Sequence, residues 1–411
     1  MKTSTFVYPW DVIGDPDAAA RIAGLGVHQA TLASAYHSTR ALTPRHPGHR
    51  VVTAEHAAVL YPQDEDRWRG RAVRPYPAGE WAPGDAYGEA ARALSAAGLD
   101  VHTWVVLAHN SRLGAEQPDT SVVNAYGDRY PWAPCIAQPA TRSYLADLAA
   151  EAAVRPGAGG TELESCGWYG LAHLHGHDKI AGVPLGDAAQ YLMSLCFCPS
   201  CRTGYADHGL DADVLAADVR RALEPLWRSE GPADEGMATV RALLGEETAP
   251  ATLAHRVRAA RELQESAVAA VRAAAPAGFQ VLLHADPAPH HCGANVGVDP
   301  AHILAVADGV VVPCTGGPGL LEPFAAHAGD GGASGAIGSS EASGTGRAGG
   351  GGAVLAANLT VVSGMGGAPA SLADDAERAR EAGATELRLY HAGLASDTDL
   401  TLVRDALTKI G

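Results

Sequence analysis

The sequence predicts a (β/α)8 barrel, and three observations support this fold class. Short apolar and β-branched runs alternate along the 411 residues with Ala-rich segments of helical spacing, a pattern typical of parallel strands covered by helices. Eight such strands can be counted. None of them leads directly into a G-x-G-x-x-G turn, which favours a closed barrel over a dinucleotide-binding sheet.

The expected elements follow one another along the chain. Asp15 is a suitable N-cap, with Pro16 at the first helical position, for a helix that ends at Ile22. Residues 38–87 are rich in Pro, Arg and His, and their apolar runs predict a small hairpin excursion from 51–53 and 58–61. We expect strands at 5–11, 27–36, 101–107, 162–164, 280–284, 309–313, 354–362 and 386–390, and helices at 87–98, 143–153 and 397–410.

We expect a single barrel domain over residues 1–411, with two additions. Residues 185–275 combine a Cys-rich loop with a helical region, 211–275, that is longer than one barrel helix requires; we interpret it as an insertion. Residues 329–352 are almost wholly Gly, Ala and Ser, a composition that predicts a flexible loop between strands six and seven.

Composition excludes several classes of partner. The net charge of −16 is spread along the chain, which disfavours binding to nucleic acid or to an anionic membrane surface. No apolar run approaches the ~20 residues of a membrane-spanning helix, and the first residues carry no secretory leader pattern. An odd number of cysteines, seven, suits reduced thiols or metal ligands. We therefore expect a cytoplasmic protein. Whether it forms a homo-oligomer is left open by the sequence.

The candidate site residues stand just past the ends of the expected strands, because a barrel of this kind forms its site from the loops at the carboxyl ends of its strands. Most of them are polar or aromatic. In chain order they are Trp10, Asp11, Tyr36, His37, His109, Asn110, Glu162, Glu164, His284, Asp286, Cys314, Asn358, Tyr390 and His391.

Glu162 and Glu164 are the strongest candidates for chemistry. Residues two apart in a strand share a face, so both carboxylates can look into the barrel mouth. Like charges held close together raise one pKa, which would leave a proton donor beside a carboxylate. The alternative is that one Glu pairs with an arginine such as Arg388 and only stabilises the barrel.

Two histidine-containing loops follow strands four and five. His173, His175 and His177 can donate hydrogen bonds to hydroxyl groups or bind a metal, although a solvated loop explains them equally well. In the second loop, Asp286 is a candidate partner carboxylate for Glu164, and Asp11 competes for that role. An Asp before Pro287 also starts turns.

Three cysteines, Cys196, Cys198 and Cys201, have the density of a zinc site, with Cys135 or Cys166 as the fourth ligand. Four thiolates would make such a zinc structural, and no other cofactor is expected. Three reduced thiols on a loop are the alternative. Four tryptophans lie at or near strand ends or their loops, where an indole ring can stack on a sugar: Trp10, Trp104, Trp132 and Trp168. Packing between helices and barrel is the commoner role of a single tryptophan.

Three segments resemble glycoside-hydrolase-like TIM-barrel proteins, many of them actinobacterial: Asn124-Ala-Tyr-Gly-Asp128, Glu162-Leu-Glu-Ser165 and Cys196-Phe-Cys-Pro-Ser-Cys201. The resemblance implies a strand-four acid/base at Glu164. It also implies zinc ligation by Cys196, Cys198 and Cys201, as in family 42 β-galactosidases. The chain departs from the pattern at strand seven, where the family keeps its nucleophile, because residues 356–363 contain no carboxylate.

Two enzymatic hypotheses and one binding hypothesis follow. The first is a glycoside hydrolase for a small glycoside or oligosaccharide, with Glu164 as general acid and Glu162 or Asp286 as nucleophile or base. The second is a metal-dependent sugar isomerase or epimerase, with Glu164, Asp286 and His284 or His391 as ligands. The third is a carbohydrate-binding protein without catalysis.

Overall fold

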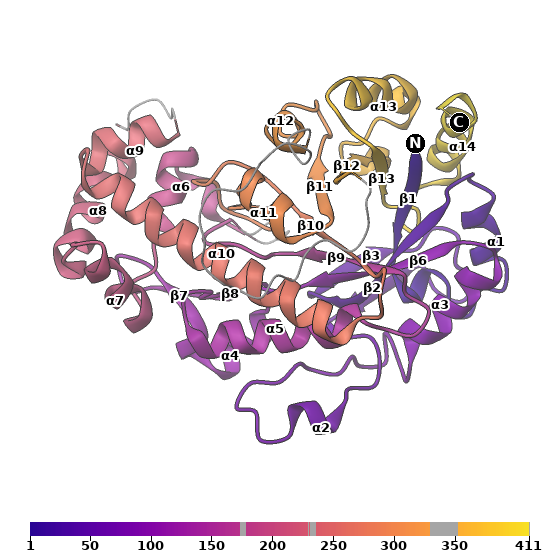
Figure 1. Cartoon of the computed structure of the whole chain (residues 1–411), viewed down its shortest axis with the longest axis horizontal. Coiled ribbons are helices and arrows are strands. Elements are labelled where there is room, and N and C mark those ends of the chain that lie inside the picture. Colours follow the sequence, from indigo (N-terminus) through magenta and orange to yellow (C-terminus); the bar gives the residue numbers. More distant parts are fainter. Residues whose placement is uncertain (173–177, 229, 231–235, 329–351, 411) are drawn as a thin grey trace, which may run out of the picture.

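Eight parallel strands close into a barrel (Figure 1). The computed structural model describes residues 1–172, 178–228, 230, 236–328 and 352–410. The last strand pairs with the first and the first with the second, so the ring is complete. In chain order the strands are β1 (Lys2–Val7), β2 (Gln29–Tyr36), β6 (Asp100–Val106), β9 (Gly160–Glu164), β10 (Gln280–His284), β11 (Gly309–Pro313), β12 (Val354–Thr360) and β13 (Glu386–Tyr390). The predicted (β/α)8 barrel is confirmed.

Helices surround this barrel, and the main apolar core lies between the two layers. Pro139 begins α5 at its first position, as the fixed φ of proline favours. The long helix α10 packs along α5 (Figure 1), and Arg142 pairs with Glu262 between them at 3.1 Å. The helices against the barrel include α1 (Ala18–Ala23), α3 (Ala86–Ala96), α5 (Pro139–Ala153), α10 (Thr248–Ala274), α11 (Pro300–Val306), α12 (Glu322–Ala328), α13 (Leu372–Glu381) and α14 (Asp397–Ile410).

The first strand ends earlier than the sequence predicts. β1 stops at Val7, and a short 3-10 helix, η1 (Pro9–Asp11), follows it. The carboxylate of Asp11 accepts a hydrogen bond from the backbone N–H of Tyr8 at 2.8 Å, which turns the chain at this point. The prediction of a strand as far as Asp11 was therefore wrong, and Asp11 belongs to a turn at the barrel mouth.

The excursion after β2 also pairs differently from the prediction. β4 (Val51–Ala54) forms its hairpin with β3 (Thr39–Leu42), while β5 (Ala58–Val59) adds antiparallel to the edge of β2. After β6, the chain forms α4 (Ser111–Glu116), η2 (Pro118–Thr120) and a second hairpin, β7 (Ser121–Val123) with β8 (Arg129–Pro134). This second hairpin was not predicted from the sequence. The remaining short elements are α2 (Glu65–Trp68), η4 (Ser363–Met365) and η5 (Pro369–Ser371).

Helices fill the connection between β9 and β10. The region predicted to be helical contains α8 (Ala212–Trp227), α9 (Met237–Leu244) and the long α10. They are preceded by η3 (Ile180–Gly182), α6 (Asp187–Met193) and α7 (Pro199–Asp207). Figure 1 shows α7, α8 and α9 at one end of the molecule, away from the barrel strands. Most of the Gly/Ala/Ser-rich segment, residues 329–351, lies outside the described part of the chain.

The middle of the barrel interior is polar. Arg388 of β13 and Glu162 of β9 form an ion pair, with 2.5 Å between Nε and Oε1, and neither side chain is exposed to solvent. In the order of the strands around the ring, β13 and β9 lie opposite each other, so the pair crosses the barrel. Thr31 of β2 donates to the same carboxylate oxygen at 3.2 Å, and Ser4 of β1 bonds to Thr31 at 2.8 Å.

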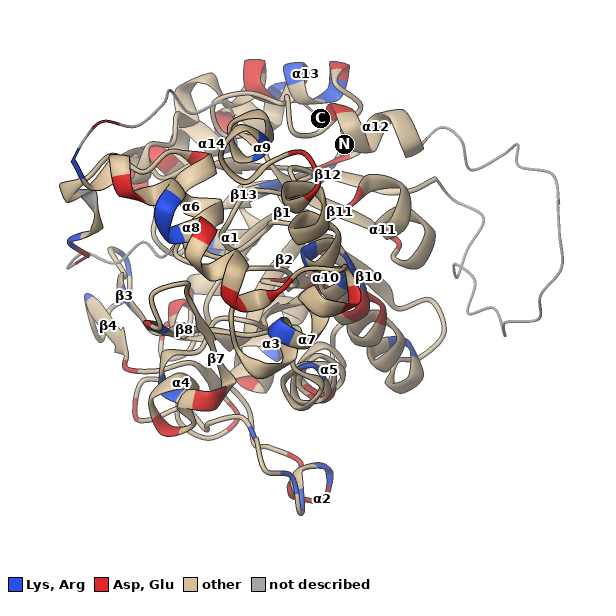
Figure 2. Ribbon diagram, turned by 90° about the vertical axis from the view of Figure 1, so that its left-hand side faces the viewer, with Lys and Arg blue, Asp and Glu red and all other residues tan. Residues whose placement is uncertain are grey.

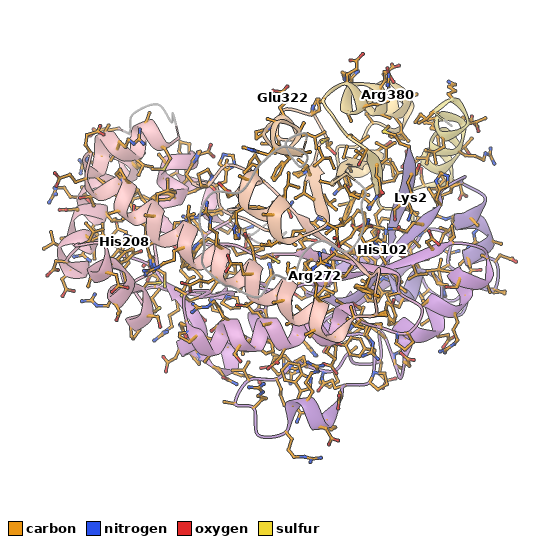
Figure 3. All side chains as sticks on the ribbon, in the orientation of Figure 1. Lys2, His102, His208, Arg272, Glu322 and Arg380 are labelled. Carbon is orange, nitrogen blue, oxygen red and sulfur yellow. The ribbon has the colours of Figure 1, made fainter. Side chains whose placement is uncertain are left out.

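The outer surface carries mixed charges. Acidic and basic residues are interspersed on the outer helices (Figure 2), with pairs one turn apart such as Arg112–Glu116 and Arg228–Glu224. Where the strands begin, Lys2 pairs with Asp100 at 3.2 Å and Arg272 pairs with Asp308 at 2.9 Å; Lys2 and Arg272 are marked in Figure 3. Within the described ranges, no helix combines the length and the apolar character needed to cross a bilayer.

Candidate active site

Glu164 is the last residue of β9 and stands at the carboxyl end of the barrel. Its Oε2 atom accepts a hydrogen bond from the indole N–H of Trp104 at 2.6 Å. Among the residues that the structure describes, no other hydrogen bond to this carboxylate is present. The side chain is half-buried, so one oxygen is held in place and the other is available to a ligand.

The chain turns sharply immediately after Glu164. Ser165 has a φ of 60°, a left-handed conformation that non-glycine residues adopt rarely and that clusters at functional sites. Two backbone bonds hold it there. Its N–H donates to the carbonyl of Ala294 at 2.8 Å, and its own carbonyl accepts from Ala108 at 3.0 Å.

Aromatic side chains from four strands surround this end of the barrel. Tyr8, Tyr36, Trp104 and His391 make ring contacts with centroids 4.3–6.2 Å apart, and the Tyr8 hydroxyl donates to the Tyr36 hydroxyl at 3.0 Å. Tyr390 lies 6.0 Å from the Trp104 ring. Burial raises the pKa of the phenols of Tyr8, Tyr36 and Tyr390, so they stay protonated and can donate hydrogen bonds at neutral pH.

His391 offers a further donor. Burial lowers its pKa to about 3, so the ring is neutral near pH 7. Because Nδ1 accepts the N–H of Gly393 at 3.1 Å, we assign the proton to Nε2. Nε2 is buried and has no partner among the described residues, which suits a hydrogen bond to a bound molecule.

Glu162 does not have the surroundings expected for a member of a catalytic carboxylate pair. It shares a face with Glu164 but lies one layer deeper, fully buried. Burial raises its pKa, but the charge of Arg388 and the neighbouring His284 outweigh this and lower the pKa to about 2. At Glu162 the structure shows the alternative considered from the sequence, a glutamate paired with Arg388. His284, whose Nε2 lies 3.6 Å from Oε2 of Glu162, belongs to the same buried layer.

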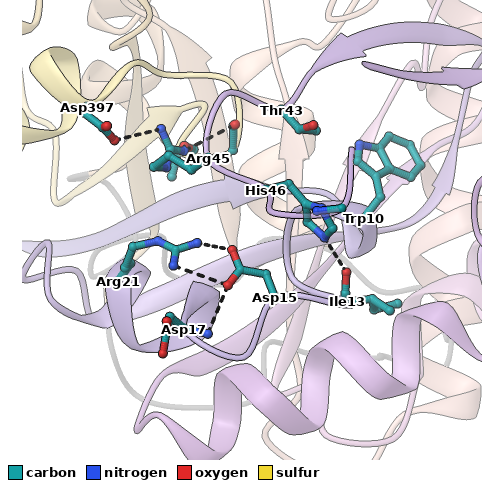
Figure 4. A network of polar contacts seen from close by, with 12 residues as sticks. Trp10, Ile13, Asp15, Asp17, Arg21, Thr43, Arg45, His46 and Asp397 are labelled. Atoms are coloured by element: carbon teal, nitrogen blue, oxygen red, sulfur yellow. Dashed lines mark hydrogen bonds and ion pairs between the residues drawn. The ribbon is translucent and has the colours of Figure 1, made fainter. Parts of the chain in front are cut away.

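The pKa of Asp11 is shifted in the opposite direction to that of Glu162. Burial raises the pKa of its carboxyl group to about 7, although the Tyr8 N–H and the charge of Arg45 act in the other direction. The side chain is 4% exposed, and Oδ2 lies 3.9 Å from Nδ1 of His391. Gly393 covers it closely, because a Cβ there would lie 1.9 Å from Oδ2. Arg45 itself is bound to the carbonyls of Ala392 and Ala395 and lies 4.0 Å from Asp397 (Figure 4).

Asp286 is engaged by its own loop. Oδ1 accepts the N–H of Ala288 at 2.8 Å, as expected for a turn-starting aspartate, and Oδ2 bonds to Nδ1 of His291 at 2.8 Å. The hydrogen bond that His291 donates to Asp286 raises the pKa of His291. Neither bond directs the carboxylate towards Glu164.

The other predicted contacts fall into four groups. His37 stacks on Tyr36 at 4.2 Å and lies 4.9 Å from the ring of His109, so both histidines belong to the aromatic wall, as does Trp10, which stacks on Tyr8 at 4.6 Å. Asn110 caps α4 through a bond from the N–H of Leu113. Trp168 donates to the carbonyl of Arg256 on α10 and packs there. His173, His175 and His177 lie outside the described residues.

Tyr8 was not among the candidates, and Trp104 was considered only as one of several tryptophans near strand ends. Tyr8 comes directly after the end of β1, two residues beyond the inward-facing Phe6. Trp104 lies on β6 directly beside Glu162 in the strand register. Tyr8 could have been found from the sequence, because inward-facing residues alternate along a strand and this alternation continues from Phe6 to Tyr8. The position of Trp104 beside Glu162 depends on the pairing of β6 with β9, which the sequence does not reveal.

The four cysteines Cys135, Cys196, Cys198 and Cys201 form a buried group whose sulfur atoms lie within 4.8 Å of one another. Cys135 follows β8, and its sulfur is 3.6 Å from those of Cys198 and Cys201. Tetrahedral zinc with bonds of 2.3 Å would hold its sulfurs about 3.8 Å apart, so the group can bind a metal ion. Cys166 is not a member; its thiol faces the carbonyl of Glu164. All seven cysteines are free of disulfides.

Comparison with known proteins identifies the fold. No protein-family model and no curated protein matches the sequence. The glycoside hydrolase domain of PgaB (BpsB) from Bordetella bronchiseptica is similar over 99% of both chains, with 14% identity and a TM-score of 0.56. The catalytic domain of a β-amylase from Paenibacillus polymyxa covers 100% of this chain and 98% of its own, with 12% identity and a TM-score of 0.54.

An α-L-fucosidase, isoenzyme 2 from Paenibacillus thiaminolyticus, matches 100% of this chain with 11% identity and a TM-score of 0.55, but this chain spans only 49% of the fucosidase. A β-galactosidase from Bacillus circulans sp. alkalophilus is likewise covered over 55% of its length, with a TM-score of 0.53. The chain therefore has the barrel fold found in these glycoside hydrolases.

Proposed function

We propose that the protein is a glycoside hydrolase in which Glu164 is the general acid/base. The observation that carries the proposal is the state of this carboxylate: half-buried at the end of a barrel strand, fixed by Trp104 at 2.6 Å and otherwise unbonded among the described residues. Aromatic faces and protonated phenols next to it suit the C–H faces and hydroxyl groups of a sugar. The substrate is then a small glycoside or oligosaccharide.

We place the second carboxylate at Asp11. Glu162 is neutralised by Arg388, and Asp286 is bound to His291, so neither faces a ligand at the mouth. Both Asp11 and Glu164 raise the pKa of Tyr390, so they lie near the same phenol. Because glycoside hydrolysis passes through a positively charged, oxocarbenium-like state, an ionised Asp11 stabilises it through space. Asp11 is 4% exposed and acts as a positioning and electrostatic residue.

The metal-dependent isomerase receives less support. Glu164, His284 and His391 are not part of either group of potential metal ligands found in the described chain. Asp286, the fourth proposed ligand, bonds to His291. His284 faces the buried Glu162.

A structural role is proposed for the cysteine group. We place a zinc ion between Cys135, Cys196, Cys198 and Cys201, because the buried sulfurs have the spacing of a four-thiolate site. When bound, zinc supplies a cross-link between β8 and the start of α7. Four thiolates leave no open coordination position, so the ion takes no part in hydrolysis.

The test is hydrolysis of a panel of 4-nitrophenyl glycosides, including galactosides, fucosides and glucosides. Glu164→Gln keeps an acceptor for Trp104 but removes proton transfer, so we expect kcat/KM to fall by roughly 100-fold or more. Glu116→Gln is the matched control: Glu116 accepts a hydrogen bond from an aromatic side chain, Tyr76, at 2.7 Å, but is half-exposed on α4.

Equal activity in Glu164→Gln and in the wild-type protein would remove Glu164 from the mechanism. If no glycoside is hydrolysed but calorimetry gives a Kd for a sugar, the protein is a carbohydrate-binding protein instead. If a sugar is isomerised, and a chelator abolishes this reaction, the isomerase hypothesis replaces the hydrolase.

A further inference from the structure

A second group of potential metal ligands lies at the rim of the barrel and is separate from the cysteine group. Asp187 is the first residue of α6, in the connection after β9, while His290 and His291 lie in the loop after β10. Their ligand atoms lie within 4.8 Å of one another. Two connections that are about 100 residues apart in sequence therefore present two imidazoles and a carboxylate to one point.

The backbone around this point is fixed from several sides. The carbonyl of His291 accepts from the guanidinium of Arg256 at 2.9 Å. Cys292 lies 3.7 Å from the carbonyl of Gln190 on α6, which ties the loop to the helix that carries Asp187. The carbonyl of Ala294, two residues after Cys292, accepts the N–H of Ser165. The ligands are thus held on a framework that also holds the residue next to Glu164.

The orientation of His291 favours a metal ligand. Its Nδ1 bonds to Oδ2 of Asp286 at 2.8 Å, which places the proton on Nδ1 and leaves the Nε2 lone pair free in the neutral ring. Metal-binding histidines are commonly oriented by a carboxylate in this way. Nε2 lies 3.4 Å from Oδ2 of Asp187. Two ligands of one tetrahedral ion, with bonds of about 2.1 Å, are separated by about 3.4 Å.

We propose that Asp187, His290 and His291 bind a divalent transition-metal ion, with Asp286 as the outer carboxylate that orients His291. Three protein ligands leave coordination positions for water. The donor set of two nitrogens and one oxygen suits Zn²⁺ or Mn²⁺ and contrasts with the sulfur ligands of the cysteine group. The ion cross-links the connection after β9 to the loop after β10 at the rim of the mouth.

Mn²⁺ binding tests this proposal. Binding is measured as the loss of the electron paramagnetic resonance signal of the free ion. The whole chain is first saturated with Zn²⁺ and then freed of excess zinc with a weak chelator, because thiolates retain zinc and bind Mn²⁺ poorly. We expect saturable binding of one Mn²⁺ per chain. His291→Gln and Asp187→Asn should abolish it, and Asp286→Asn should weaken it by about 10-fold or more.

His302→Gln is the matched control, because His302 also faces a carboxylate, that of Glu265 at 3.6 Å, but belongs to neither ligand group in the described chain. It should bind Mn²⁺ as the wild-type protein does. The thermal midpoint without metal shows that each variant is folded. Absence of saturable binding of both Mn²⁺ and added Zn²⁺ in the wild-type protein, or unchanged binding in His291→Gln, overturns the proposal. Metal binding is measured without substrate, so the outcome is independent of hydrolysis.

Discussion

Asp11 shows how one residue couples the stability of this protein to pH. Its carboxyl group is 4% exposed, and its Oδ1 has no hydrogen-bond partner among the described residues. Burial therefore raises the pKa from 3.8 to about 7. The folded protein binds the proton more tightly than the unfolded chain, so the free energy of unfolding falls as the pH rises between these two values.

Asp11→Asn should remove this dependence. Relative to the wild-type protein, the variant should gain unfolding free energy as the pH rises from about 4 to about 7, by up to roughly 4 kcal/mol, and no more above that range. Urea denaturation at several pH values measures it, with Asp119→Asn, at a position 98% exposed, as the control. The wild-type kcat/KM should rise through about pH 7 as Asp11 ionises, and the variant should lack that rise. A constant difference in stability at all pH values would contradict the assignment.

Glu162 and Glu164 show what residue patterns alone can and cannot give. The spacing correctly places both on one face of β9, and Arg388 was named as an alternative partner from the sequence. Which glutamate has that partner depends on how deep each side chain lies inside the barrel. Arg388 is 226 positions away in sequence, so a local pattern does not show which glutamate it contacts. No local pattern contains that information, so the sequence could not separate the buried ion pair from the carboxylate at the mouth.

At the scale of elements, the cysteine group joins two segments that otherwise share few bonds. The N–H of Phe197 donates to the carbonyl of Val123 on β7, and the N–H of Val123 lies 3.4 Å from the sulfur of Cys196. Cys198 is the N-cap of α7. The hairpin β7–β8 and helix α7 therefore meet around the four sulfurs.

Cys196→Ser should lose the zinc ion that we place here. After a weak chelator has removed zinc that is not held by thiolates, we expect one zinc per wild-type chain by elemental analysis and much less than one in the variant, with a lower thermal midpoint because the cross-link is gone. Cys314→Ser is the control, since Cys314 is buried but stands alone at the end of β11. Equal zinc content in Cys196→Ser and the wild-type protein would show that the metal binds elsewhere.

The elements themselves were predictable to different degrees. Strands such as β10, β11 and β13 have the predicted bounds, because a short apolar run between turns has few other ways to fold. The ends of β1 and the partners of β4 and β5 depend on side chains elsewhere, such as the carboxylate of Asp11. Helices α11, α12 and α13 were not predicted individually; the first two have only seven residues each, too few for a clear helical period.

At the scale of the whole molecule, the pair Arg388–Glu162 connects opposite sides of the barrel. Glu162→Gln should leave Arg388 buried with a weaker partner and lower the free energy of unfolding by about 3–5 kcal/mol at pH 7. The pKa of about 2 in the folded state means that this contribution is present above about pH 4.5 and is lost as the pH falls towards 2. The difference between variant and wild type should therefore shrink in acid.

A double variant checks the coupling. Glu162→Leu combined with Arg388→Met should be less destabilised than the sum of the two single variants, because each single change leaves an unpaired buried charge. Chemical denaturation of all four proteins measures this. Additive losses would mean that the two side chains are stabilised independently.

The global fold was the most predictable feature, since eight alternating apolar runs leave few topologies. The candidate site was predictable only in part. Strand ends pointed to Glu164, Tyr36, Tyr390 and His391, but the contacts of Trp104 and Asp286 come from neighbouring strands and loops. Loop geometry of this kind carries no periodic signal.

Ring closure between β1 and β13 has a consequence for the order of events during synthesis. A ribosome delivers β13 only after 385 residues have emerged, so until then β1 exposes one unpaired edge and Glu162 has no arginine across from it. If the first seven strands pair before β13 emerges, they form an open sheet with a charge in its interior. The last strand therefore closes the barrel. Until it is synthesised, we expect chaperones that shield open sheet edges to be needed.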